Sequence, residues 1–182
     1  MFPLDYRNKI EITHINQSDI INYQKRFLTE MSEELRIVKA SEIQIQDSKI
    51  SFWVASFRFV HNWNILVPID SGYIEVLPSS KSVVISYYIS FKRLFISATV
   101  LLILFGIILV QDSAMSLNEK VFLLLGGWLF VVGGNLLIAM IRIHAFIKRI
   151  VRKVDSQIIQ QRILYLNDDL FRHYKIGTLP KF

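Results

Sequence analysis

Two long apolar stretches dominate the pattern of hydrophobic and polar positions. Residues 94–110 and 121–141 contain no charged side chain, over 17 and 21 positions. As helices they would be roughly 26 and 32 Å long, against a hydrocarbon core of about 30 Å. A chain of 182 residues is too short to surround two such helices on every side. The pattern therefore predicts a transmembrane hairpin over residues 91–141, with residues 111–120 as the loop between the spans.

The region before the first span, residues 1–90, shows the mixed periodicity of an α+β domain. Helical spacing of apolar residues predicts one helix in IINYQKRFLTEM, with Ser18 as its N-cap. Turn residues at 47–48, 70–72 and 78–80 separate several of the segments that read as strands. We expect one helix packed against an antiparallel sheet of about five or six strands, in KIEITHI, EIQIQ, KISFWV, WNILVPI, YIEVL and SVVISYYIS.

Beyond the second span, residues 142–182 begin with the pattern of a basic amphipathic helix. Apolar residues recur at spacings of three and four, and basic residues fill the positions between them. Such a helix could lie on the inner leaflet, extend the second span as a coiled coil, or pack back onto the domain. The basic positions are Lys148, Arg149, Arg152 and Lys153.

The distribution of Lys and Arg predicts the orientation. Lys92 and Arg93 precede the first span, and Arg142 opens the basic segment after the second, whereas the loop between the spans holds only Lys120. Cytoplasmic flanks of spans carry the excess of positive charge. We therefore expect a multi-pass protein of the inner (plasma) membrane with both termini in the cytoplasm.

The charge distribution also indicates the partner of the basic segment. The chain carries a net charge of +6, and residues 121–182 alone carry nine Lys or Arg against three Asp or Glu. A basic excess just beyond a span lies next to anionic head groups of the inner leaflet. This position favours the lipid bilayer over nucleic acid as the partner.

Four glycines cluster in GGWLFVVGGN, residues 126–135. A phosphate-binding loop would need a preceding strand and a charged partner, and both are missing from this apolar segment. In lipid, small residues instead let helix backbones approach closely. We predict that Gly126, Gly127, Gly133 and Gly134 pack against the first span, where Thr99 and Gly106 share their spacing of seven, or against another subunit or partner membrane protein.

Asn135 follows the second glycine pair and is the one amide within the two spans. A polar side chain in a span is costly unless it faces a helix, a partner or water. We expect an interhelical hydrogen bond; a position lining a pore or transport path is the alternative.

No catalytic motif is present, and His14, His61, His144 and His173 lack metal-ligand spacing. We expect no cofactor, no metal and no enzymatic activity. The hypothesis is an oligomeric, membrane-anchored binding or assembly module. The alternative is a ligand-sensing two-span effector or channel-like subunit whose cytosolic domain controls assembly of the spans.

Overall fold

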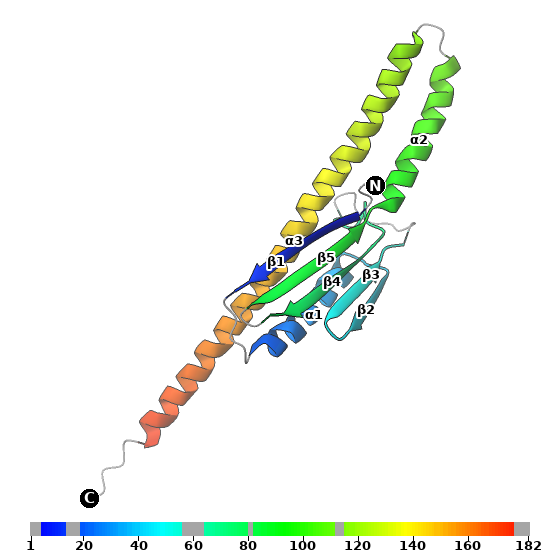
Figure 1. Cartoon of the computed structure of the whole chain (residues 1–182). Helices are drawn as coiled ribbons and strands as arrows, with labels where there is room; N and C mark the ends of the chain where they lie inside the picture. The colour runs from blue at the N-terminus through cyan, green and yellow to red at the C-terminus, as the bar shows by residue number, and fades with distance from the viewer. Residues whose placement is uncertain (1–4, 14–18, 56–63, 80–81, 112–114, 177–182) are drawn as a thin grey trace, which may run out of the picture.

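The computed structural model describes residues 5–13, 19–55, 64–79, 82–111 and 115–176. Within these ranges, five strands and three helices follow one another along the chain (Figure 1). They are β1 (Asp5–Ile12), α1 (Ile20–Ile37), β2 (Glu42–Gln46), β3 (Lys49–Trp53), β4 (Ser71–Pro78), β5 (Val83–Ser90), α2 (Lys92–Gln111) and α3 (Leu117–Ile176).

The strands form one antiparallel sheet in the order β1-β5-β4-β3-β2. This confirms the α+β class and the antiparallel sheet. The predicted two-residue turn between β2 and β3 is also present, because Gln46 pairs with Lys49. Asp47 has φ of 46° in that turn, a left-handed conformation that Asp tolerates better than most residues.

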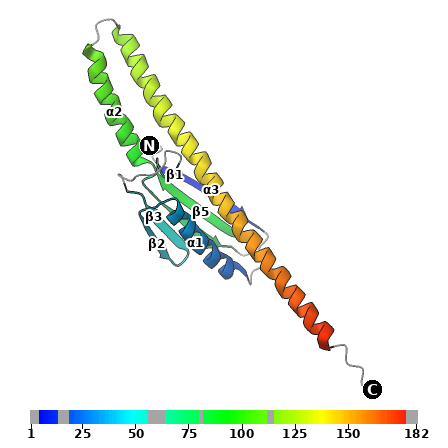
Figure 2. The same ribbon diagram turned by 180° about the vertical axis from the view of Figure 1, so that it is seen from behind.

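Helices α1 and α3 cover the same face of the sheet, as the two opposite views show (Figures 1 and 2). Every second residue of β4 and β5 points into the layer between sheet and helices, including Ile74, Val76, Ile85 and Ile89. From α1, Phe27, Leu28 and Met31 complete the same core. The period-two strands and the apolar face of α1 therefore meet as the sequence pattern predicts.

Helix α3 joins the hairpin to the domain without a break. The second span and the basic segment are parts of one helix of 60 residues. Its middle packs into the domain core through Ala139, Ile143, Phe146, Ile147, Ile150, Val151 and Val154. The basic segment thus continues the second span and also packs on the domain, and the core extends beyond residues 1–90.

The upper part of α3 and α2 form a hairpin that projects from the domain (Figure 1). Both helices are long and apolar enough to cross a membrane, and only 11% and 6% of their most apolar windows are buried in the chain. A core helix of a soluble protein would be mostly covered. Exposed apolar surface of this extent is what a bilayer would cover.

Two local expectations in the sheet are wrong. Residues 64–69 of WNILVPI form turns, because Asn64 accepts the Leu66 N–H at 2.9 Å and donates to the Val38 carbonyl at 2.8 Å. Gly72, expected in a turn, lies inside β4 between Phe52 and Ile89. The expected N-cap Ser18 lies outside the described residues, and Asp19 occupies the cap position of α1.

Candidate functional site

The start of α2 is fixed to the domain by one arginine and one aspartate. The backbone N–H of Arg93 donates to Asp70 Oδ2 at 2.7 Å, and its Nε lies 3.3 Å from Asp70 Oδ1. Its Nη1 donates to the Val54 carbonyl at 2.9 Å. A carboxylate at the first turn also matches the positive end of the helix dipole. The first span therefore leaves the sheet from a defined point.

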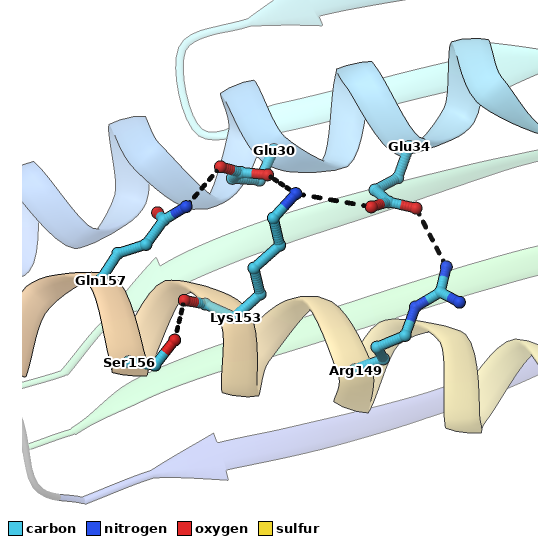
Figure 3. A network of polar contacts seen from close by, with 6 residues as sticks. All are labelled: Glu30, Glu34, Arg149, Lys153, Ser156 and Gln157. Carbon is cyan, nitrogen blue, oxygen red and sulfur yellow. Dashed lines mark hydrogen bonds and ion pairs between the residues drawn. The ribbon is translucent and has the colours of Figure 1, made fainter.

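A polar network holds α3 against α1 (Figure 3). Lys153 Nζ lies 2.6 Å from Glu30 Oε2 and 3.6 Å from Glu34 Oε1, while Arg149 Nη2 lies 2.9 Å from Glu34 Oε2. Gln157 adds a hydrogen bond of 2.8 Å to Glu30 Oε1. Both glutamates are only 15% exposed, so the network borders the core.

This network changes the roles expected of the basic segment. Arg149 and Lys153 pair with carboxylates of the domain, because α1 presents Glu30 and Glu34 along the line where α3 docks. The ion pairs commit these two residues to the domain. Lys148 and Arg152 are exposed on α3, as is Lys92 at the start of α2. For these three residues, contact with anionic head groups stays a prediction.

The network predicts a pH dependence of stability. Hydrogen bonds from Lys153 and Gln157 hold the pKa of Glu30 below its ordinary value of 4.5. A lowered pKa stabilises the fold above pH 4.5, and this contribution is lost as pH falls from there through the folded-state pKa. Thermal unfolding of Glu30→Gln should therefore change less between pH 7 and acid than the wild type does.

The control for this prediction is Glu33→Gln, an exposed glutamate on the same helix. It should keep the wild-type pH profile. An identical acid response in Glu30→Gln and the wild type would contradict the assignment. At high pH the stability depends on the paired lysine. Glu30 raises the pKa of Lys153, so the stability that this ion pair contributes is lost only as pH rises through the raised pKa.

A second polar contact joins α3 to the sheet. Tyr87 Oη lies 2.6 Å from His144 Nδ1, and burial raises the pKa of Tyr87, with Tyr6 adding to the effect. Nothing in the local sequence around His144 indicates a tyrosine of β5 as its partner. A protonated phenol can donate to a neutral imidazole, so the pair fixes the rotation of α3 against the sheet.

The glycine pairs do not mediate the contact between the two spans. A Cβ placed on Gly126, Gly127, Gly133 or Gly134 would meet nothing within 4 Å. The expectation that they pack on α2 within this chain is therefore wrong. Contact of the glycines with another subunit or partner membrane protein stays a prediction.

Trp128 and Leu124 make the contact between the spans instead. The Trp128 ring packs edge-on against Phe95 with centroids 5.3 Å apart, and its Nε1 donates to Thr99 Oγ1 at 3.3 Å. Leu124 would lie 3.6 Å from a Cβ on Gly106. Thr99 and Gly106 thus belong to the helix interface as expected, but with other partners. The sequence signal that could indicate this helix contact is the position of Trp128 deep within the apolar stretch.

Asn135 does not bond across the hairpin. Its Nδ2 donates to the Val131 carbonyl of its own helix at 2.7 Å. The side chain instead lines a cavity of about 240 Å³ where the hairpin meets the domain. Arg93 and Ser97 of α2, Arg142 of α3, and Asn64 also line it. This junction cavity brings together three residues singled out in the sequence: Arg93, Asn135 and Arg142.

The sheet face opposite the helices carries stacked aromatic and basic side chains. Tyr73 and Tyr88 stack with centroids 5.2 Å apart, Arg7 lies over Tyr88 at 5.2 Å, and Lys49 lies over Tyr73 at 4.0 Å. Neither α1 nor α3 covers this face (Figures 1 and 2). The arrangement offers a flat polar and aromatic surface on the side away from α3.

Among the described residues, no group of three His, Asp or Glu side chains is arranged to hold a metal ion. Comparison with protein families, with curated proteins and with solved structures gives no match. The fold itself defines the class: a small α+β domain fused to a hairpin of two helices, each able to cross a membrane.

Proposed function

We propose that this chain is a membrane-anchored assembly module that holds its α+β domain in a fixed position at the cytoplasmic surface of the inner membrane. The observation that carries the proposal is the double role of α3. The same helix supplies the second apolar helix of the hairpin and, through Ile143, Ile147 and Ile150, the core of the domain. Hairpin and domain are therefore expected to move as one body.

The proposal includes association through the hairpin. A Cβ at any of the four glycines of α3 would meet nothing within 4 Å, on a helix that exposes Phe130, Leu137 and Ile141. In a bilayer, such small residues let a second helix approach closely. A second copy or a partner membrane protein would pack there, and the Tyr73–Tyr88 face of the sheet would remain available to a cytoplasmic partner.

The alternative, a ligand-gated effector, requires the hairpin to rearrange relative to the domain. Such a rearrangement would have to break the buried contact along residues 139–154 and the ion pairs of Arg149 and Lys153. Packed cores resist continuous deformation. We therefore favour the assembly module over the ligand-gated effector. The proposed module has no enzymatic activity.

Association is tested by measuring the mass of the full chain in mild detergent by light scattering. We expect a defined oligomer, or a stable complex when the chain is purified with its native neighbours. Gly133→Leu, which puts a bulky side chain on the exposed face, should reduce the particle size. Ile138→Leu is the matched control, because Ile138 is an exposed, large apolar residue on the same helix.

Two outcomes would contradict the proposal. A wild-type chain that is monomeric and without partners removes the assembly function. An oligomer of unchanged size in the Gly133→Leu and Gly126→Leu variants shows that association does not use the glycine face.

A further inference from the structure

The junction cavity has the chemistry of an anion site. Two arginines, Arg93 and Arg142, line it with Asn64 and Asn135, and no aspartate or glutamate is among its lining residues. Asp70 pairs with Arg93 from outside the lining. Arginine binds phosphate through several parallel N–H donors.

An apolar cavity of about 280 Å³ lies further along the same two helices. Leu101 and Phe105 of α2 line it together with Leu124, Gly127 and Val131 of α3. No charged side chain contributes to it. Its walls are those that a hydrocarbon chain would contact.

The two cavities follow one line along the hairpin. On α2, Ser97 of the junction cavity is four residues before Leu101 of the apolar cavity. On α3, Asn135 is four residues after Val131 and eleven after Leu124. Residues at spacings of three, four, seven and eleven share a helix face. Eleven residues correspond to about 16 Å, and half of the hydrocarbon core is about 15 Å thick.

We propose that this groove is a specific binding site for one phospholipid with an anionic head group. The phosphate lies between Arg93 and Arg142 at the junction, and one acyl chain lies between α2 and α3 in the apolar cavity. Arg142 follows the last apolar residue of the second span, so the polar cavity lies at the depth of the head groups. The inference goes beyond the assembly function and requires no oligomer.

The site differs from general attraction to the inner leaflet. Lys148 and Arg152 are exposed and would attract any anionic surface, with little preference for a particular molecule. The groove adds the arginine and asparagine residues of the junction cavity and the apolar walls of the second cavity. Lipid binding should therefore depend on residues of both cavities, whereas a surface effect would depend on exposed basic residues alone.

The test measures binding of single lipids to the full chain in detergent by native mass spectrometry. The probes are phosphatidylglycerol and phosphatidylcholine with the same acyl chains. We expect the anionic lipid to bind about tenfold more tightly, which corresponds to about 1.4 kcal/mol, because the choline of phosphatidylcholine adds a positive charge next to Arg93 and Arg142 and the glycerol of phosphatidylglycerol adds none. Arg142→Gln should abolish this preference, while Lys148→Gln, with the same change of charge outside the groove, should keep it.

A second pair of variants tests the apolar cavity and covers the case in which Arg142→Gln does not fold. Leu101→Trp fills the cavity and should weaken binding of both lipids. Leu104→Trp is its control, because both leucines are exposed on α2, at 65% and 54%, but only Leu101 lines the cavity. Equal effects of the two tryptophans would overturn the acyl-chain part of the proposal.

Two further results would overturn the whole site. One is equal binding of the two lipids by the wild type. The other is displacement of the bound lipid by millimolar inorganic phosphate, which would assign the cavity to a soluble anion. The mass of the protein is recorded in the same spectra, so loss of lipid binding is distinguishable from loss of association.

Discussion

Ile147→Asp is expected to release α3 from the domain. Ile147 is 0% exposed and lies in the core between α3 and the sheet. Truncating such a side chain to alanine typically costs about 2–5 kcal/mol. An unpaired carboxylate adds the penalty of burying a charge. The total is comparable with the whole stability of a small domain, about 5–15 kcal/mol.

The measurement is thermal unfolding of the detergent-solubilised chain, combined with limited proteolysis of residues 5–90. We expect loss of the cooperative transition of the domain and rapid cleavage, while the hairpin keeps its helical signal. Ile159→Asp is the matched control, because this isoleucine of α3 is 57% exposed. If both variants unfold at the wild-type temperature, α3 is not part of the domain core and the proposed rigid anchor fails.

Gly72→Ala is expected to destabilise the sheet strongly despite adding a single methyl group. A Cβ at this position would lie 2.7 Å from the Tyr88 carbonyl oxygen and 2.8 Å from both Ile89 Cδ1 and Phe52 Cζ. The Tyr88 carbonyl oxygen belongs to the backbone of β5, which pairs with β4, so the sheet itself holds this atom in place. Overpacking of this kind typically costs about 1–3 kcal/mol.

Gly106→Ala is the control for this substitution. Its added methyl would meet Leu124 Cδ1 at 3.6 Å, an ordinary contact, and alanine favours a helix. Chemical denaturation followed by tryptophan fluorescence should show a lowered midpoint for Gly72→Ala and an unchanged midpoint for Gly106→Ala. An unchanged midpoint in Gly72→Ala would show that β4 can shift away from its neighbours.

The elements with a strong period were predictable from the sequence. The two charge-free stretches indicated α2 and the first part of α3, and alternation identified β2 and β5 nearly to the residue. The Asp47–Ser48 turn followed from local chemistry, since Asp tolerates positive φ. Each of these features depends on neighbours within a few positions, so the chain carries the signal locally.

Other features depended on partners far along the chain. WNILVPI is apolar enough for a strand, yet the amide of Asn64 bonds to Val38 and residues 64–69 form turns, although Leu66 and Ile69 are still buried. Gly72 reads as a turn residue until β3 and β5 are placed on either side of it. The hydrophobic pattern alone does not specify which strands become neighbours.

The candidate site shows the same division. The sequence by itself determined that Arg93, Asn135 and Arg142 flank or interrupt apolar spans, and that a basic, apolar-striped helix follows. Only the tertiary structure decided that α3 continues unbroken into the domain, that Arg149 and Lys153 face carboxylates of α1, and that the glycines make no close contact with α2. The physical reason is that periodicity defines the face of a helix, whereas the partner of that face is selected by packing between segments far apart in the chain.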